Sequence, residues 1–279
     1  MRIEKTKLSM NAILDEKRQE GTIGFVPTMG ALHEGHLSLV QRSVNENDYT
    51  VVSVFVNPTQ FNNPEDLSTY PRTLEADVEL LKEAGCDMVF APSVKEMYPE
   101  PDHRTFDFGT LETVMEGEMR PGHFNGVGQI VSKLFDYVRP DHAYFGMKDF
   151  QQVAIIQRLV ELLNLNVEIV PCDIIREEDG LAKSSRNLLL TENHRLAAPT
   201  IYKVLKESVA LDKALTVEKT IQRTIAEINK NTLLEVEYFS IVNDRTLQPM
   251  NKWEDAERAV GCIAVQAGAV RLIDNIVFN

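Results

Sequence analysis

The feature that most constrains the fold is an alternation of short apolar runs with helical patterns over the first 175 residues. The apolar runs are rich in Val, Ile and Phe and end near Gly, Pro or Asn, which is typical of buried strands. They occupy residues 22–27, 50–56, 88–91, 143–145 and 166–170. Helical patterns lie between or beside them, at residues 37–44, 74–85, 127–137 and 153–163. Such alternation predicts an α/β fold, a Rossmann-like doubly wound parallel sheet with its ligand site at the carboxyl ends of the strands.

The pattern changes after residue 175. Residues 191–206 and 217–229 have the periodicity of amphipathic helices, and residues 234–242 and 262–267 have that of strands. Helices followed by strands indicate a smaller α+β domain with an antiparallel sheet. The charged, turn-prone run at residues 176–180 (REEDG) marks the boundary, so we expect domains at residues 1–175 and 176–279.

Net charge limits the partners that this chain can have. Its 279 residues include 42 Asp and Glu against 29 Lys and Arg, a formal net charge of −13. An acidic protein repels nucleic acid and anionic membranes, so we expect neither as a partner. An anionic substrate must instead be bound by locally gathered cations and backbone amides.

The cysteines and the N-terminus bear on the cellular compartment. Cys86, Cys172 and Cys262 form no C-x-x-C pair and stand beside apolar residues, which predicts reduced, buried thiols. The first ten residues lack the apolar region of a signal peptide, and no run approaches the roughly 18 apolar residues of a membrane span. We therefore expect a cytoplasmic protein.

The most informative segment is residues 27–36, PTMGALHEGH, which begins where a strand ends and finishes where a helix starts. Its glycines allow close approach of the backbone to a ligand, and the helix N-terminus offers unpaired N–H groups to an anion. His33 and His36 could hydrogen-bond phosphate oxygens and stabilise charge that develops at an α-phosphate. Two other interpretations remain: helix-start histidines with no catalytic role, or two ligands of a zinc site. Further zinc ligands at suitable spacing are not evident.

The H-x-G-H pattern resembles the HIGH element of the nucleotidyltransferase superfamily, whose companion is a downstream Lys/Ser-rich loop of the KMSKS kind. Residues 181–187, LAKSSRN, are the candidate for that loop. Taken alone, such a loop is more often a solvated turn. Following the first motif in the order that the superfamily has, it is expected to hold the β- and γ-phosphates.

Three further segments narrow the family: residues 55–61 (FVNPTQF), 120–127 (RPGHFNGV) and 145–152 (FGMKDFQQ). With the two motifs above, they make the chain resemble the pantoate–β-alanine ligase family over nearly its whole length. The resemblance implies a homodimer that uses Mg²⁺ and ATP in two steps. Pantoate attacks the α-phosphate to give pantoyl adenylate and pyrophosphate, and β-alanine then displaces AMP to give pantothenate, the precursor of coenzyme A. The domain at residues 176–279 is expected to act as a lid that carries the KMSKS-like loop.

The resemblance also implies which residues form the site. His36, as the proton donor, His33 and Lys148 are the expected catalytic residues. The expected ATP contacts are Met29, Gly30, Ala31, Leu32, His33, Glu34, Gly35, His36, Gly146, Met147, Lys148, Asp149, Ile175, Lys183, Ser184, Ser185 and Arg186. The expected contacts with pantoate or β-alanine are Gln60, Gln152 and Asn57, and with lower priority Arg120 and His123. Asp77 is a candidate for organising Mg²⁺ through water or through the bound phosphates, the alternative being a solvated helix face.

Several of these assignments make chemical sense on their own. The side-chain amides of Gln60 and Gln152 each carry a donor and an acceptor, so they can orient pantoate without a competing ion pair. The Lys148 ammonium can stabilise the negative charge of a pentacoordinate transition state. The chain departs from the family pattern at three positions. Met147 stands where Glu is common, Lys183 where an apolar residue is common, and Asn125 where Arg is frequent.

Three other functions compete with this interpretation. A nucleotidyltransferase that builds a dinucleotide would use the H-x-G-H motif and the phosphate loop but would not need NPTQF or KDFQQ. A tRNA synthetase would need a basic RNA-binding face, which an acidic chain of this length does not provide. A non-catalytic nucleotide sensor would not require His36, Lys148 and Arg186 together.

Overall fold

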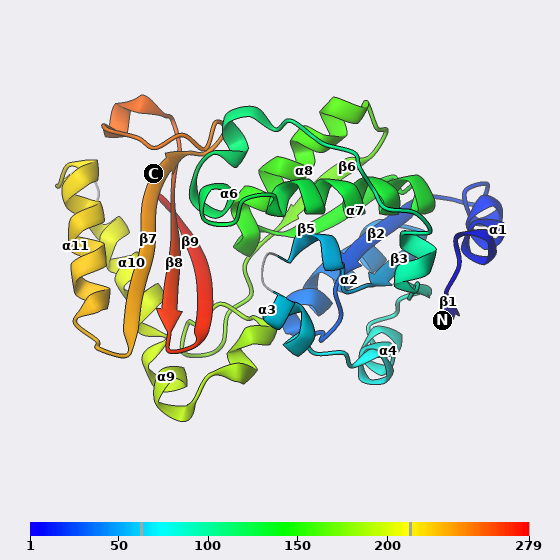
Figure 1. The fold of residues 1–279 in the computed structure, drawn as a ribbon, viewed down its shortest axis with the longest axis horizontal. Helices are drawn as coiled ribbons and strands as arrows, with labels where there is room; N and C mark the ends of the chain where they lie inside the picture. Colours follow the sequence, from blue (N-terminus) through cyan, green and yellow to red (C-terminus); the bar gives the residue numbers. More distant parts are fainter. Residues whose placement is uncertain (62–63, 212–213, 279) are drawn as a thin grey trace. The chain divides into compact units, whose positions relative to one another are not determined.

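The computed structural model describes residues 1–61, 64–211 and 214–278, which form two compact units (Figure 1). The first unit comprises Met1–Phe108, Arg120–Met147 and Ile155–Asp173. The second comprises Gly109–Met119, Lys148–Ala154 and Ile174–Asn279. Among the described residues, no helix combines the length and the apolarity needed to cross a bilayer.

The first unit contains a six-stranded sheet in the order β1-β4-β3-β2-β5-β6, and all its strand pairs are parallel. The strands are β1 (Arg2–Glu4), β2 (Ile23–Thr28), β3 (Tyr49–Val54), β4 (Met88–Phe90), β5 (His142–Gly146) and β6 (Glu168–Cys172). The predicted doubly wound parallel sheet is confirmed. The short edge strand β1 was not predicted, because its sequence, Arg-Ile-Glu, lacks an apolar run.

Helices cover both faces of this sheet. On one face, α2 (Glu34–Glu46) and α4 (Leu74–Glu83) belong to the same apolar cluster as Val26 and Val52 of the sheet. On the other face, Phe135 of α7 (His123–Val138) packs edge-on against Phe25, and α7 contacts α1 (Lys7–Lys17). Phe25 and Val26 are consecutive in β2, so their side chains point to opposite faces. Shorter helices are α3 (Pro64–Thr69) and α5 (Val94–Met97).

The order of the strands reverses between β2 and β5. The chain leaves β2 through α2 toward β3, whereas from β5 it runs through α8 (Phe150–Leu163) to β6 at the opposite edge. In a doubly wound sheet, ligands bind at such a switch point, outside the carboxyl ends of the two strands that flank it. Here those ends are Thr28 and Gly146.

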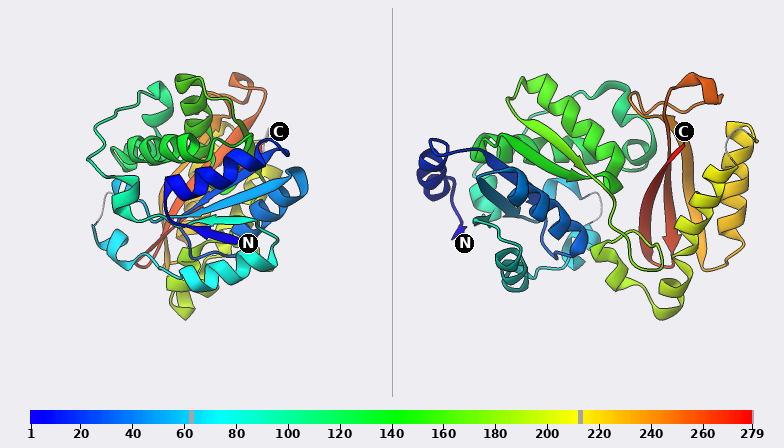
Figure 2. Two further views of the ribbon diagram at one scale, coloured as in Figure 1. Left: turned by 90° about the vertical axis from the view of Figure 1, so that its right-hand side faces the viewer. Right: turned by 180° about the vertical axis from the view of Figure 1, so that it is seen from behind.

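The second unit is built on an antiparallel sheet, β7-β8-β9 (Figure 2). Its strands are β7 (Leu234–Asn243), β8 (Ala259–Ala267) and β9 (Val270–Phe278). One face packs on α10 (Thr200–Ala210) and α11 (Val217–Asn229) in an apolar cluster that includes Ile263. The other face includes Cys262 and packs on α6 (Met115–Met119) and the first turn of α8. The predicted α+β composition of this region is therefore confirmed.

Two details of the second unit differ from prediction. The helix expected over residues 191–206 is two helices, α9 (Glu192–Ala197) and α10, because Pro199 lies between them and cannot continue the hydrogen bonding of a helix. Strand β9 was not predicted, since Asp274 and Asn275 interrupt its apolar pattern. The three thiols are free and buried, as predicted.

Candidate active site

The loop after β2 turns sharply at Gly30 and Ala31. Gly30 has φ +82° and Ala31 has φ +51°. The conformation at position 30 favours glycine because glycine has no Cβ. The Thr28 hydroxyl stabilises the turn: it donates to the carbonyl of Ser53 at 2.7 Å and accepts from the backbone N–H of Gly30 at 3.2 Å. The loop between β2 and α2 is thereby fixed to the neighbouring strand β3.

Asp77 of α4 holds the same loop from the side. Its carboxylate accepts hydrogen bonds from the backbone N–H of Ala31 at 3.0 Å and of Leu32 at 2.8 Å, and from the Thr73 hydroxyl at 3.3 Å. Only 2% of Asp77 is exposed, so the solvated helix face considered above is wrong. A carboxylate so engaged is a poor direct ligand for a metal ion. Its observed contacts give it the role of positioning the loop.

His33 and His36 lie together at the N-terminus of α2. Their ring centroids are 4.1 Å apart with an angle of 39° between the ring planes. His33 caps the helix, because its Nδ1 accepts from the backbone N–H of Gly35 at 3.1 Å. In the neutral ring, the proton of His33 is therefore on Nε2, which can donate to an anion. Two imidazoles and the amides of a helix N-terminus can together bind a phosphate group.

Gln60 lies after β3 in a 3-10 turn, Pro58–Gln60, and Asn57 holds its side chain. The Asn57 amide donates to Gln60 Oε1 at 3.1 Å and to the carbonyl of Gly126 in α7 at 3.3 Å. A Cβ on Gly126 would lie 2.4 Å from the carbonyl of Thr59, so only glycine allows α7 to approach the turn this closely. Asn57 is only 1% exposed, and its contacts give it a role in holding Gln60.

His123 contacts the backbone of the same turn, and Arg120 contacts the His123 ring. His123 Nδ1 is 2.8 Å from the carbonyl oxygen of Gln60, and Arg120 Nη1 is 3.2 Å from His123 Nε2. His123, at the start of α7, is 6% exposed. The direct ligand contacts expected for Asn57, Arg120 and His123 remain predictions, whereas the structure shows all three supporting Gln60.

At the end of β5, Gly146 and Met147 are half-buried. No atom lies within 4 Å of the position that a Cβ on Gly146 would occupy, so the backbone is accessible at the carboxyl end of this strand. Ligands bind at this end of the strands in a doubly wound sheet, and the ATP contact predicted at Gly146 stays a prediction.

In the second unit, Lys148 and Gln151 are fixed by contacts with distant parts of the chain. The side-chain amide of Asn275 in β9 donates to the carbonyl of Lys148 at 3.0 Å. Gln151 donates to the carbonyls of Leu111 and Val114, both at 2.8 Å. Lys148 Nζ lies 3.8 Å from the carboxylate of Asp149, and Gln152 is half-buried beside them.

The KMSKS-like loop begins with a small hairpin. Arg176 and Ala182 form an antiparallel bridge, and the backbone N–H of Lys183 donates to the carbonyl of Ile175 at 2.9 Å. The Arg176 guanidinium makes two bonds to the Asp274 carboxylate of β9, at 2.7 and 3.0 Å, and lies 3.5 Å from the centre of the Tyr202 ring. The loop is thus attached at its base to a strand of the unit's own sheet.

Beyond the hairpin, Ser184 caps the 3-10 turn Ser185–Leu189 by accepting from the backbone N–H of Arg186 at 3.3 Å. Lys183 Nζ is 3.1 Å from the carboxylate of Glu177. The residue that departs from the family pattern here therefore has its charge partly balanced within the loop.

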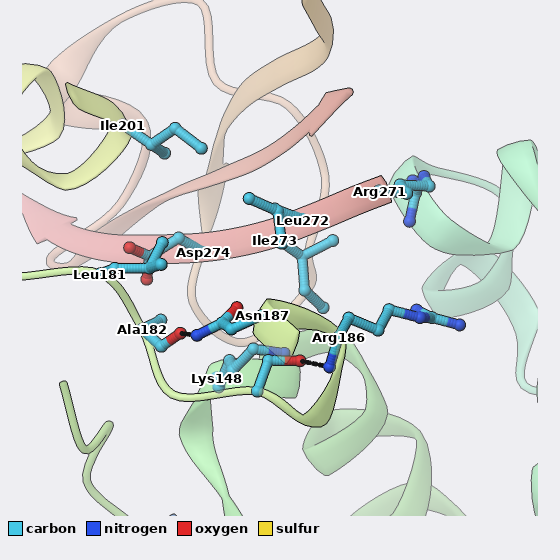
Figure 3. Close-up of a pocket in the computed structure, with 11 residues that line it drawn as sticks. Lys148, Leu181, Ala182, Arg186, Asn187, Ile201, Arg271, Leu272, Ile273 and Asp274 are labelled. Atoms are coloured by element: carbon cyan, nitrogen blue, oxygen red, sulfur yellow. Dashed lines mark hydrogen bonds between the residues drawn. The ribbon is translucent and has the colours of Figure 1, made fainter. Parts of the chain in front are cut away.

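A pocket lies between this loop and β9 (Figure 3). Figure 3 shows Lys148, Arg186 and Asn187 opposite Ile273 and Asp274. Arg271 also lines the pocket, and its guanidinium is hydrogen-bonded to Glu116 and Glu237 at 2.7–3.1 Å. These carboxylates balance Arg271, and Asp274 is paired with Arg176. Two further cations, Lys148 and Arg186, line the pocket, and cationic side chains bind anions such as a polyphosphate through charge-assisted hydrogen bonds.

Comparison with known proteins identifies the family. A family model described as pantoate-beta-alanine ligase matches residues 2–277. The chain belongs to the pantoate–β-alanine ligase family. It is therefore an enzyme, a ligase, and the resemblance noted in its sequence is confirmed. The pantothenate synthetases of Porphyromonas gingivalis ATCC 33277 and Bacteroides thetaiotaomicron are 55% and 54% identical to it, over 100% of this chain and 100% and 99% of theirs.

Solved structures agree with this assignment. Pantothenate synthetase from Thermus thermophilus has a TM-score of 0.92 and 42% identity to this ligase, over 99% of both chains. Pantoate-beta-alanine ligase from Francisella tularensis, complexed with beta-gamma ATP and β-alanine, has a TM-score of 0.84 and 36% identity, over 99% of this chain and 97% of that one.

The predicted site residues of the ligase fall into two sets, one in each unit. The first unit contains the loop 29–36, Asp77, Asn57, Gln60, Arg120 and His123, together with Gly146 and Met147. The second contains Lys148, Asp149, Gln152, Ile175 and residues 183–186. The zinc alternative has no support in the part of the chain that the structure describes, where no group of three or more His, Cys, Asp or Glu side chains could hold a metal.

The residues that support these sets were not predicted from the sequence. Tyr98, whose hydroxyl donates to Asn57 Oδ1 at 2.7 Å, lies in no segment that was singled out. The pair Asp274 and Asn275 supports Arg176 and Lys148 from β9. Two adjacent polar residues inside an apolar strand were a usable signal, because a buried polar side chain needs a partner.

Proposed function

We propose that this ligase joins pantoate to β-alanine through pantoyl adenylate, consuming ATP and releasing AMP and pyrophosphate. The observation that carries the proposal is the His33–His36 pair at the N-terminus of α2, directly after the strand that ends at the switch point of the sheet. A helix N-terminus with two imidazoles suits an α-phosphate that gains negative charge.

In the proposed first step, a carboxylate oxygen of pantoate attacks the α-phosphorus of ATP. A bond forms between this oxygen and the phosphorus, and the bond from the phosphorus to the α,β-bridging oxygen breaks with pyrophosphate as the leaving group. His36 and His33 donate hydrogen bonds to the α-phosphate oxygens. Lys148, Ser184, Ser185 and Arg186 stabilise the charge of the departing pyrophosphate.

In the proposed second step, the uncharged amine of β-alanine attacks the carbonyl carbon of pantoyl adenylate. The new C–N bond forms, the bond between that carbon and the phosphate oxygen breaks, and AMP leaves. The amine gives up one proton as the amide forms. Gln60 orients pantoate in both steps, and Gln152 is the second amide assigned to this role.

Mg²⁺ belongs to this proposal as part of the nucleotide substrate. Asp77 does not fit a direct ligand, since its carboxylate already accepts from two backbone N–H groups and a hydroxyl. Mg²⁺ commonly binds through substrate phosphates and keeps several waters, so a dedicated set of protein ligands is not required.

The family also suggests a cytoplasmic homodimer and a lid role for residues 176–279, and both belong to the proposal. Light scattering coupled to size-exclusion chromatography tests the dimer. A mass near twice 31.6 kDa supports it and a mass near 31.6 kDa contradicts it.

Product analysis tests the reaction. The protein is incubated with Mg²⁺, ATP, pantoate and β-alanine, and each component is omitted in turn. Pantothenate, AMP and pyrophosphate formed in equal amounts, and only in the full mixture, are the expected result. ADP and phosphate in place of AMP and pyrophosphate would show acyl-phosphate chemistry and contradict the roles given to His36 and Lys148. Bound ATP without any turnover would favour a nucleotide sensor.

A further inference from the structure

The side chain of Gln60 is held in one orientation by its neighbours. An amide can present either its carbonyl oxygen or its NH₂ group to a ligand, and a half-turn about its last bond exchanges the two. The contacts around Gln60 and Asn57 decide between them, and all of these contacts lie within the first unit.

The orientation of Asn57 follows from Gly126 and the backbone N–H of Thr59, and the Tyr98 hydroxyl holds the side chain in that orientation. The Tyr98 hydroxyl donates to Asn57 Oδ1 at 2.7 Å, and the Thr59 hydroxyl lies 3.2 Å from the same oxygen. On the opposite side, Asn57 Nδ2 donates to the backbone carbonyl of Gly126 at 3.3 Å, and this carbonyl can only accept. A flipped Asn57 would place its oxygen against the Gly126 carbonyl and its NH₂ group against the backbone N–H of Thr59, which donates to Oδ1 at 3.5 Å.

Asn57 in turn fixes Gln60. Because Asn57 Nδ2 donates to Gln60 Oε1 at 3.1 Å, the acceptor of the Gln60 amide is already used inside the protein. Gln60 Nε2 lies 3.2 Å from the sulfur of Met29, and a thioether is a weak acceptor. An oxygen of a bound ligand would be a better partner for this NH₂ group than the sulfur.

The backbone of Gln60 is held by a second chain of contacts. Arg120 has only donors, so its contact at 3.2 Å requires His123 Nε2 to accept. The proton of His123 is then on Nδ1, which donates to the carbonyl of Gln60 at 2.8 Å. Tyr98 acts through Asn57 on the side chain of Gln60, and His123 acts on its main chain.

We propose that Tyr98 and His123 are positioning residues that make Gln60 a dedicated hydrogen-bond donor. Gln60 then recognises an oxygen of pantoate, either of the carboxylate or of a hydroxyl, and does not bind the ammonium group of β-alanine, which would need an acceptor. This inference rests on the proposed function and adds the direction of the hydrogen bond at Gln60 and the residues that set it.

A double-mutant cycle with Tyr98→Phe and Gln60→Ala tests the proposal. Tyr98→Phe removes only the hydroxyl that holds Asn57 Oδ1. It should raise KM for pantoate about tenfold, the effect of losing one hydrogen bond, and leave KM for ATP and for β-alanine within twofold. In the Gln60→Ala background, the same change should add less than twofold, because the residue through which Tyr98 acts is absent. Tyr137→Phe is the matched control in the same unit, and its KM for pantoate should stay at the wild-type value.

Two variants of His123 test the proposal independently of the Tyr98 variant. His123→Asn retains an N–H donor near the position of Nδ1, whereas His123→Gln retains one near Nε2. His123→Asn should keep KM for pantoate within about threefold of wild type, and His123→Gln should raise it about tenfold.

The outcomes separate the inference from the proposed function. If the wild-type enzyme does not turn over pantoate, both are overturned. If it does, the inference alone is overturned by any of three results. These are additive effects of Tyr98→Phe and Gln60→Ala, a rise in KM for β-alanine as large as that for pantoate, or a His123→Asn variant no better than His123→Gln.

Discussion

The two histidines at the start of α2 are distinguished by their surroundings. His33 accepts from the backbone N–H of Gly35 and so caps the helix, whereas His36 lies within the first turn, where its ring is 4.1 Å from that of His33. His33 thus has a structural contact as well as its proposed contact with phosphate. His36 is the residue of the pair whose replacement reports most directly on chemistry.

His36→Asn should lower the rate of pantoate-dependent exchange between ATP and pyrophosphate by about 10²–10³, the usual effect of losing one donor that stabilises a charged transition state. The exchange assay with labelled pyrophosphate measures the first step alone. His103→Asn, at an exposed histidine of the same unit, is the control and should be unchanged. Equal losses in both variants would contradict a specific role for His36.

Asp77→Asn tests whether this residue positions the loop or binds a metal. An amide cannot accept from both Ala31 and Leu32, because one of its two ends is a donor. We expect KM for ATP to rise about tenfold and the Mg²⁺ concentration for half-maximal rate, at saturating ATP, to stay unchanged. Glu79→Gln on the exposed side of α4 is the control. A shift of the Mg²⁺ dependence in Asp77→Asn alone would contradict the positioning role.

At the scale of single residues, the sequence predicted the side chains expected to bind or react better than the residues that hold them in position. The histidines are recognisable because their spacing and the flanking glycines lie within ten residues. The partners of Asp77 lie 45 and 46 residues away along the chain, and Tyr98 acts on Asn57 across 41 residues. Such contacts depend on which elements become neighbours in the fold, and local periodicity does not carry that information.

Among the elements, β9 organises the part of the second unit that is proposed to bind phosphate. Its consecutive residues Asp274 and Asn275 hold Arg176 at the base of the KMSKS-like loop and the main chain of Lys148. Side chains of consecutive strand residues point to opposite faces, so one strand can support two segments that are distant in sequence. The position of the proposed phosphate ligands therefore depends on a strand that contributes no predicted ligand.

Asp274→Asn should reduce the free energy of unfolding by about 2–4 kcal/mol, because it leaves the Arg176 guanidinium without its buried charge partner. It should also raise KM for ATP. Urea denaturation and steady-state kinetics measure the two effects. The control is Glu257→Gln at the exposed pair of Arg245 and Glu257, which should change neither. Normal ATP kinetics in a measurably destabilised Asp274→Asn variant would contradict the supporting role of β9.

The elements themselves were predicted where their periodicity is regular. The five strands predicted in the first unit and helix α11 lie close to their expected ranges. The errors have physical causes: Pro199 divides one expected helix, and the polar residues in β9 and the short polar strand β1 obscure their strand patterns.

At the scale of the whole molecule, buried thiols and phenols make the free energy of unfolding depend on pH in alkaline solution. Burial raises the pKa of the Cys86 thiol from 9.0 to about 12, and burial likewise raises the pKa of Tyr144 from 10.0 to about 12. An acid whose pKa is raised by folding keeps its proton more tightly in the native state. The stabilisation is complete below the unfolded pKa and is lost as pH rises from that value toward the folded one.

We therefore expect the free energy of unfolding to fall between about pH 9 and 12, by as much as about 1.4 kcal/mol per pH unit for each such group. Urea denaturation of the wild type and of Cys86→Ala at pH 8, 9.5 and 10.5 measures this. The stability advantage of the wild type over Cys86→Ala should shrink by about 2 kcal/mol across the series. A constant advantage would contradict the raised pKa of Cys86.

The central claim for the whole molecule is that the carboxylate of pantoate attacks the α-phosphorus of ATP. Transfer of an oxygen isotope tests it most directly. With pantoate labelled by ¹⁸O in both carboxylate oxygens, one labelled oxygen becomes the bridge of the adenylate and leaves with AMP when β-alanine attacks. Mass spectrometry should find one ¹⁸O in AMP and one in pantothenate. Unlabelled AMP formed together with pantothenate would contradict the adenylate route.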